Sequence, residues 1–335
     1  LLFAGLGIQS SVAGVPYRQF QQIQQYQMIV SENLSETNQD KANLEEVLKG
    51  QAIQAYQKIY SKTLDKDFKG KAGLQTVTLM MTEKEDLTPF IHLQHHQQEL
   101  TLKDGVVITA KLAQLAGVKV GQTLEIEGKE LTVAAITENY VGHFIYMSQA
   151  SYEQIYGQLP QANTYLVSLR DTSATSIERQ AGLLMNQAAV SSVVQNASAI
   201  RLFDSVASSL NQTMTILVIV SVLLAIVILY NLTNINVAER IRELSTIKVL
   251  GFHNNEVTLY IYRETIVLSL VGIVLGLVAG FYLHQFLIQM ISPATILFYP
   301  QVGWEVYVIP VVAVSTILTL LGFLVNRHLR KVDML

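Results

Sequence analysis

Residues 239–252 read ERIRELSTIKVLGF, a charged stretch that lies between two long apolar runs. The run before it, 213–238, contains no Lys, Arg, Asp or Glu, and the run after it, 265–304, contains none either. Apolar runs of this length can cross a bilayer core of about 30 Å. A short polar helix held between two membrane spans can do no chemistry on its own, but it can receive force from a partner.

Three apolar runs lie in the last third of the chain and predict three transmembrane helices, at 211–236, 263–288 and 304–326. Pro293 and Pro300 interrupt the pattern between the second and third of these helices. The opening residues LLFAGLGI are too short to cross a membrane or to act as a signal peptide. We interpret 1–13 as the end of a preceding transmembrane helix in a fragment of a longer protein.

Basic residues set the expected orientation. The segment 239–263, which ends at the first residue of the second span, carries Arg240, Arg242, Lys248 and Arg263, whereas the loop 288–304 carries no basic residue. The apolar runs predict a multi-pass protein of the cell membrane, expected to be a bacterial plasma membrane, and the positive-inside rule predicts its orientation. The cytoplasmic parts are a coupling segment at 237–262 and a tail at 327–335, and the extracytoplasmic parts are a domain at 14–210 and a loop at 289–303.

Whole-chain composition hides this division. The net charge of −3 and the apolar content of 50% are averages over a polar domain and a set of membrane helices, so they say little about either part. No nucleic-acid partner is expected. The chain has no cysteine, which excludes disulfides, thiolate metal sites and a cysteine nucleophile.

The polar region 14–210 has a mixed α+β pattern. Helical spacing predicts helices at 43–59 and 173–188. Period-two alternation predicts strands at 26–31, 74–81, 164–169 and 190–194. Within it we expect a β-rich subdomain at 99–150, containing a strand at 105–109, a helix at 110–116 and a hairpin that turns at Gly128 and Lys129. Helical spacing then resumes at Ile200 and continues into the first span without a breaker.

The charged stretch 239–252, followed by Glu256-Val257 and by Tyr262-Arg263-Glu264 before a glycine-rich span, resembles the FtsX-like permease family of ABC transporters, of the macrolide-exporter type. The runs 105–109, 117–123 and 145–148 look like the periplasmic-core-type domain of that family. The opening residues 7–11, with Gln19-Phe20 and Tyr26 downstream, are similar to the C-terminal module of long Gram-positive-type permeases.

This resemblance implies a permease subunit without enzymatic activity and without a cofactor of its own, since ATP and Mg²⁺ would bind a separate cytoplasmic ABC ATPase. Further implied partners are a second permease half or copy, membrane lipids and an extracellular hydrolase or peptide. The implied role is export or extraction of a peptide or lipid-type substrate, or control of an extracellular partner. The alternative is a membrane receptor or scaffold that senses an extracellular ligand, such as a peptide antibiotic, without transport.

The coupling segment also has the physical features of a docking helix. Apolar residues recur every third position from Ile241 to Leu250, and Gly251 is placed to end the helix. The residues expected to contact the ATPase are Glu239, Arg240, Arg242, Glu243, Leu244, Ile247, Lys248, Gly251 and Phe252. The alternative is an interfacial helix on lipid headgroups. Its mixed rather than purely basic charge argues against that alternative.

Three glycines, Gly272, Gly276 and Gly280, share one face of the second span and predict close packing against another helix. The alternative is that they are hinges or filler. His284 is interpreted as a water-facing side chain at the outer end of this span rather than as a substrate or proton site.

Other motifs are weak. Residues 117–123 lack the Gly-Lys-Ser/Thr of a phosphate-binding loop, so no nucleotide site is expected in this chain. We interpret His92, His95 and His96 as a solvated loop rather than a zinc site, and no metal site is expected.

Overall fold

A computed structural model of the chain describes residues 1–68, 72–83, 87–95, 98–102, 105–249, 254–298 and 301–331. The chain divides into two compact units. We call residues 14–206 with 292–299 the sheet unit, and residues 1–13, 207–291 and 300–335 the helical unit.

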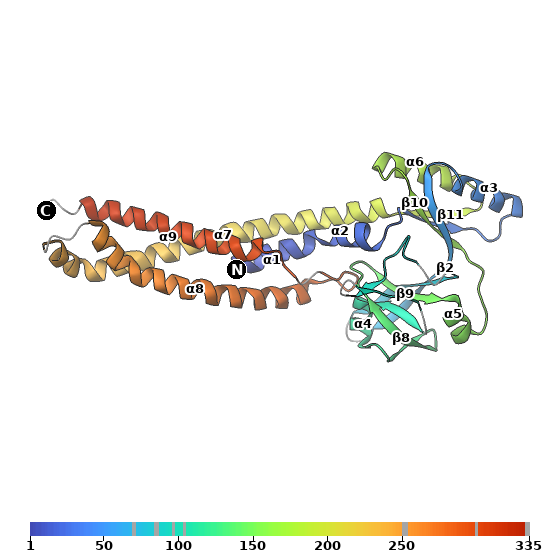
Figure 1. Ribbon diagram of the computed structural model, residues 1–335, viewed down its shortest axis with the longest axis horizontal. Coiled ribbons are helices and arrows are strands. Elements are labelled where there is room, and N and C mark those ends of the chain that lie inside the picture. The colour runs from blue at the N-terminus through green and yellow to red at the C-terminus, as the bar shows by residue number, and fades with distance from the viewer. Residues whose placement is uncertain are drawn as a thin grey trace. The chain divides into compact units, whose positions relative to one another are not determined.

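The sheet unit contains a mixed nine-stranded sheet among its described residues, in the order β11-β1-β10-β2-β3-β9-β6-β8-β7 (Figure 1). Its strands are β1 (Met28–Glu32), β2 (Ile53–Phe68), β3 (Gly73–Thr82), β6 (Val106–Thr109), β7 (Thr123–Ile126), β8 (Lys129–Thr137), β9 (His143–Ser148), β10 (Thr164–Leu169) and β11 (Val190–Gln195). A small hairpin adds β4 (Gln94–His95) and β5 (Gln98–Glu99). The helices are α2 (Val15–Tyr17), the π-helix η1 (Arg18–Ile23), α3 (Asn38–Leu48), α4 (Ala110–Ala116), α5 (Gln149–Tyr156) and α6 (Ala174–Met185).

Two hydrophobic cores divide the sheet unit into two lobes joined by β2. The first lobe, built from β1, β10, β11, α3 and α6, is centred on Val30, Leu44 and Val167. The second lobe, built from β3, β6 to β9, α4 and α5, is centred on Leu79, Ile108 and Ile145. Strand β2 pairs with β10 along its first half and with β3 along its second half. A single long strand therefore belongs to both lobes, which Figure 1 shows one above the other.

The predicted β-rich segment 99–150 lies in the second lobe and supplies β6 to β9. Strand β9 pairs in parallel with β3, and β6 pairs with β9, so these strands continue the main sheet. The second core also includes Phe68, Val77 and Tyr152, which lie outside 99–150. The lobe is therefore wider than the predicted subdomain, because β3 and α5 bury their apolar faces in the same core.

Local sequence explains several element boundaries. Thr37, Ser148 and Ser173 cap the N-termini of α3, α5 and α6 by accepting backbone N–H groups three residues later. Glu127 and Gly128 have φ values of 50° and 73°, as a two-residue type I′ hairpin requires. The predicted hairpin forms between β7 and β8, but its two turn residues are Glu127 and Gly128 rather than the predicted Gly128 and Lys129.

The predicted helix at 43–59 is wrong in its second half. Helix α3 ends at Leu48, and β2 begins at Ile53. Ala52 and Ala55 fit the helical spacing, but Ile53, Gln57 and Ile59 alternate on one side of a strand whose pairing with β10 satisfies their backbone groups. Non-local pairing has thus overridden a local periodicity.

The first lobe contains a buried ion pair. The side chain of Glu32 is fully buried, and its Oε2 lies 2.5 Å from Nζ of Lys58, which also lies 4.9 Å from the ring centre of Tyr165. Burial acts to lower the pKa of Lys58, but hydrogen bonds to Glu32 and Tyr165 outweigh it and raise that pKa overall. Among the described residues no other group pairs with this carboxylate.

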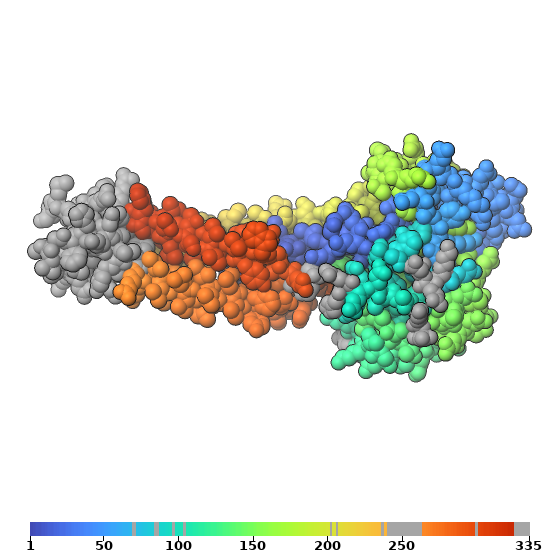
Figure 2. All heavy atoms as spheres, viewed as in Figure 1, coloured from blue at the N-terminus to red at the C-terminus, as the bar shows by residue number. Residues whose placement is uncertain are grey.

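The helical unit consists, in its described part, of α1 (Leu2–Ala13), α7 (Asn196–Val249, whose first residues lie in the sheet unit), α8 (Asn254–Ile291) and α9 (Glu305–Lys331). Three stretches of these helices are long and apolar enough to cross a membrane: Asn196–Ile235, Arg263–Ile291 and Glu305–Leu324. Figure 2 shows the described atoms of α8 and α9 from one side. These helices expose large apolar side chains such as Leu275 and Phe323. Such surfaces are stable in lipid rather than in water.

Replacing Lys58 with Met should destabilise the first lobe, because it leaves a buried carboxylate without its partner. We expect the free energy of unfolding to fall by about 2 to 3 kcal/mol, less than for a fully buried pair because Lys58 is about one-third exposed. Pulse proteolysis in urea of the detergent-purified chain measures this value.

The exposed pair Lys49 and Glu45 supplies the control. Lys49→Met should cost less than about 1 kcal/mol. The double variant Glu32→Gln/Lys58→Met should recover part of the lost stability. Equal effects of Lys58→Met and Lys49→Met would contradict the assignment.

Candidate functional site

The predicted coupling segment continues the longest helix of the chain. Helix α7 runs without a break for 54 residues, from the end of β11 to Val249. The backbone of 239–249 is therefore helical, and α8 begins at Asn254, as the capping pattern predicted. Glu239 is exposed, whereas the side chains of Arg240, Arg242, Glu243, Leu244, Ile247 and Lys248, and all atoms of Gly251 and Phe252, lie outside the described part of the structure.

The three predicted packing glycines of α8 have different surroundings. A Cβ atom at Gly280 would lie 2.7 Å from Cβ of Phe3, so α1 approaches α8 closely at this point. The Phe3 ring also meets Tyr307 of α9 edge to face, with centroids 5.0 Å apart. At Gly272 and Gly276 no described atom lies within 4 Å of such a Cβ. Within the described chain, close packing is therefore a property of Gly280.

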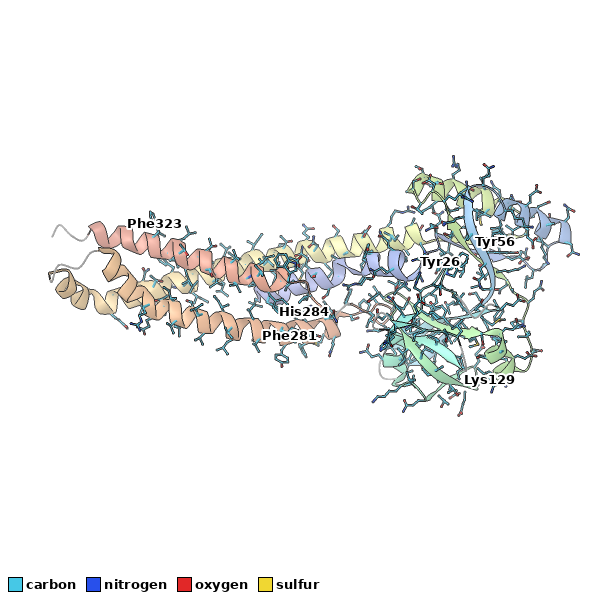
Figure 3. The ribbon with its side chains drawn as sticks, viewed as in Figure 1. Tyr26, Tyr56, Lys129, Phe281, His284 and Phe323 are labelled. Atoms are coloured by element: carbon cyan, nitrogen blue, oxygen red, sulfur yellow. The ribbon has the colours of Figure 1, made fainter. Side chains whose placement is uncertain are left out.

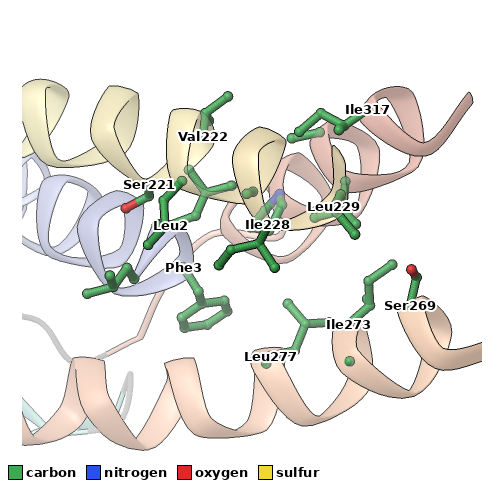
Figure 4. Close-up of a pocket in the computed structure, with 18 of the residues that line it drawn as sticks. Leu2, Phe3, Ser221, Val222, Ile228, Leu229, Ser269, Ile273, Leu277 and Ile317 are labelled. Carbon is green, nitrogen blue, oxygen red and sulfur yellow. The ribbon is translucent and has the colours of Figure 1, made fainter. Parts of the chain in front are cut away.

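Gly272 and Gly276 line a cavity of about 450 Å³ within the helical unit (Figure 4). Its wall is almost entirely apolar and is formed by α1, α7, α8 and α9; it includes Leu2, Phe3, Ile228, Ile273, Leu277 and Ile317. Two polar side chains of the wall, Ser221 and Ser269, are labelled in Figure 4. The cavity offers no polar group array that would orient a polar solute.

His284 was predicted to face water, and that prediction is wrong. Its side chain is fully buried on α8 (Figure 3), and its Nε2 lies 3.0 Å from Oγ of Ser11 on α1. A Cβ at Gly7 would lie 2.6 Å from the imidazole ring, so the ring fills the space that this glycine leaves. A polar side chain in an apolar bundle is stabilised by a partner on a neighbouring helix.

Sequence reasoning missed Gly7 and Ser11 as the partners of His284. The available signal was weak: a glycine and a serine four residues apart, on one face of a short apolar segment. Together with Gly280 and Phe3, they attach α1 to α8 at two levels.

A second buried polar group lies in the second lobe of the sheet unit. His143 of β9 is 2% exposed, and neither ring nitrogen has a hydrogen-bond partner among the described residues. Burial, and then the charge of nearby Lys111, lower the pKa of His143. Burial also lowers the pKa of Lys111, whose Nζ donates to Oγ of Ser292, 3.2 Å away.

The described residues contain no cluster of three His, Asp or Glu side chains that would hold a metal ion. Of the histidine stretch, His95 belongs to β4, and His96 lies outside the described residues.

These features define a chain with a mixed-sheet unit and a helical unit in which three stretches are long and apolar enough to span a membrane. Residues 215–334 match the FtsX-like permease C-terminal family. This match covers 120 of the 335 residues, including α8, α9 and the part of α7 from position 215 onward.

Two solved structures are similar to the chain. The periplasmic region of MacB from Actinobacillus actinomycetemcomitans shares 11% identity, with 54% of this chain and 94% of that one covered and a TM-score of 0.31. The extracellular domain of the noncanonic ABC-type transporter YknZ from Gram-positive bacteria shares 14% identity, with 51% and 99% covered and a TM-score of 0.29. No curated protein sequence matches the chain.

Gly280→Ala should weaken the contact between α1 and α8, because the new methyl group would meet Cβ of Phe3, which cannot rotate away. Overpacking of this kind costs about 1 to 3 kcal/mol. We expect a lower melting temperature of the detergent-purified chain. Gly276→Ala is the matched control, since it enters open space, and it should not lower the melting temperature. Equal behaviour of both variants would contradict the packing described here.

The sheet unit should lose stability in mild acid through His143. An unfolded histidine has a pKa of about 6.5, and the folded pKa is lower. Between the two values the unfolded chain binds more protons, so the free energy of unfolding falls as pH drops through about 6.5. Urea unfolding at pH 7.5 and 5.5 tests this: His143→Leu should reduce the loss, whereas His95→Leu, at an exposed site, should keep it.

Proposed function

We propose that the chain is the permease subunit of an ABC transporter and that it transmits the motion of a separate cytoplasmic ATPase to its sheet unit. The observation that carries this proposal is helix α7. It continues from β11, contains the span Asn196–Ile235 and reaches the start of the coupling segment. A helix of 54 residues is about 80 Å long, more than twice the roughly 30 Å of a bilayer core.

The proposed orientation follows from charge. Arg240, Arg242 and Lys248, with Arg263 directly after the segment, favour a cytoplasmic position for 237–262, and the sheet unit and the loop 289–303 are then expected to face the outside. The proposed coupling residues are Glu239, Arg240, Arg242, Glu243, Leu244, Ile247, Lys248, Gly251 and Phe252.

In this proposed role the chain transmits motion and carries out no chemical reaction itself. The ATPase binds and hydrolyses ATP with Mg²⁺, and a second permease half or copy completes the membrane assembly. A peptide or lipid-type substrate, or an extracellular hydrolase or peptide partner, responds to the moving sheet unit. The apolar cavity beside Gly272 and Gly276 supports this picture only in that its lining suits lipid or another helix rather than a polar solute.

Docking of the coupling helix follows the physics of other interfaces. Leu244 and Ile247 supply the apolar burial, while Arg240, Arg242 and Glu243 set the orientation by charge pairing at the rim. A charge at Leu244 would be desolvated without a partner, which costs several kcal/mol.

Leu244→Asp should uncouple the permease from its ATPase. The measurement is co-purification of the two proteins and ATP turnover in phospholipid bilayers, where we expect at least a tenfold loss of permease-stimulated turnover. Arg242→Glu should cause a smaller loss. The sheet unit should stay folded, because the substitution lies across the membrane from it.

Thr246→Asp is the matched control, because two residues along a helix place the same charge on nearly the opposite face. It should retain stimulation. Undiminished binding and stimulation in Leu244→Asp and Arg242→Glu would refute the coupling role. The receptor or scaffold alternative, in which the helix lies on lipid headgroups, would then be favoured.

A further inference from the structure

The turn between β8 and β9, which we call the Asn139 turn (residues 138–142), receives two segments of the chain that are far apart in sequence. One is η1, which follows α1. The other is 292–297, which follows α8. Both segments belong to the sheet unit, and both are bound to the turn by hydrogen bonds.

The first segment is attached by Gln19, which is completely buried. Its side-chain Oε1 accepts the backbone N–H groups of Tyr140, at 2.7 Å, and of Val141, at 3.2 Å. Its Nε2 donates to Oδ1 of Asn139 at 2.9 Å. Asn139 in turn donates from Nδ2 to the carbonyl oxygens of Val141 and Gly142, so one amide organises the turn and the other attaches it to η1.

The helix η1 has π-type hydrogen bonding, and the N–H of Gln24 donates to the carbonyl of Gln19 at 2.8 Å. Its buried residues are Gln19 and Ile23, while Gln21 and Gln22 are exposed. π-type turns are intrinsically unfavourable and recur at functional positions. Here the π-helix positions one buried glutamine, Gln19, which accepts two hydrogen bonds and donates one to the Asn139 turn.

The second segment pairs with the same turn as a short antiparallel bridge. The N–H of Gly142 donates to Thr295, the N–H of Leu297 donates to Tyr140, each at 2.8 Å, and Val141 lies opposite Ile296. Ser292 donates to the carbonyl of Ile296 at 2.6 Å and accepts from Lys111 of α4. The backbone groups of the turn are therefore used on both sides.

Helix α7 is attached elsewhere in the sheet unit. Its first residue, Asn196, follows β11 of the first lobe and donates from Nδ2 to the carbonyl of Tyr26 at 2.6 Å. Its backbone N–H donates to Gln27 at 3.0 Å.

We propose that the Asn139 turn is a fixed joint at which η1 and 292–297 are fused, so that the segments after α1 and α8 act on the second lobe as one body. Gln19 is the positioning residue of this joint, and the joint stays closed whenever the transporter works. The joint itself follows from the contacts of this chain, whereas its part in relaying motion rests on the proposed function.

Disulfide crosslinking tests the joint in the full chain in membranes, because the chain has no cysteine of its own. Val141 and Ile296 form a non-hydrogen-bonded antiparallel pair, with Cα atoms expected about 4.5 Å apart, which suits a disulfide. We expect Val141→Cys/Ile296→Cys to crosslink almost completely on mild oxidation, and equally fast in energised and ATP-depleted cells. Little crosslinking, or a rate that differs between the two conditions, would overturn the fixed joint.

Gln19 is tested on the same background. Gln19→Ala should slow crosslinking at least fivefold, because the N–H groups of Tyr140 and Val141 lose their acceptor. Gln22→Ala, on the exposed side of η1, should leave the rate unchanged. Equal rates in the two variants would remove Gln19 from the joint. Failure of the joint and failure of the proposed function are separable, since the latter is measured by Leu244→Asp.

Discussion

The helical unit depends on one constraint: where apolar side chains exclude water, every backbone N–H and C=O must be paired within the chain. Helix α7 meets this constraint for 54 residues by pairing all of its interior groups with its own turns. Its composition changes along the way, from polar residues near Asn196 to an apolar span and then to the charged run that starts at Glu239. A single hydrogen-bonded element therefore contains three stretches of different chemical character, and this continuity supports α7 as the carrier of the proposed motion.

The same constraint explains how α1 is attached to α8. Hydrophobic burial does not drive helices together in lipid, so contact depends on close approach and on polar pairs. Glycines at 7 and 280 admit the His284 ring and Phe3, and Ser11 supplies the polar partner of that ring. The contact is thus made where a glycine on one helix faces a bulky side chain on the other. Gly276 and Gly272 continue the same face without such a match and border a cavity instead.

Features set by short-range chemistry could be predicted from the sequence. The apolar runs of α8 and α9 and the start of α8 at Asn254 depend on neighbouring residues alone. So does the hairpin between β7 and β8, although its turn lies one residue before the predicted position. The strand at 53–59 could not be predicted, since its partner β10 lies more than a hundred residues away. The coupling residues stay predictions, because the side chains that would decide them lie outside the described residues.

The buried polar groups were the hardest to predict. Gln19 is one of six glutamines between positions 19 and 27, and nothing local marks it as the one that meets the Asn139 turn. His284 carried a signal, a polar ring in an apolar span, but its burial depends on α1, which lies far away in sequence. The physical reason is the same in both cases. A buried polar side chain is defined by its partner, and the partner is chosen by the fold.

The two lobes give the sheet unit a specific mechanical character. Covalent and hydrogen-bonded links from α7 enter the first lobe, whereas the segments after α1 and α8 meet on the Asn139 turn of the second lobe. Strand β2 is the element that pairs with both lobes, through β10 on one side and β3 on the other. If α7 and the joint move together, the sheet unit moves as a whole and β2 carries no load. If they move by different amounts, the difference must be absorbed at the change of partners between Ile59 and Tyr60 of β2 and in residues 24–27, which join η1 to β1 of the first lobe. In the proposed function, the attachment of α7 to the first lobe, with η1 and 292–297 joined at the second lobe, would let a shift of α7 change the shape of the sheet unit as well as its position.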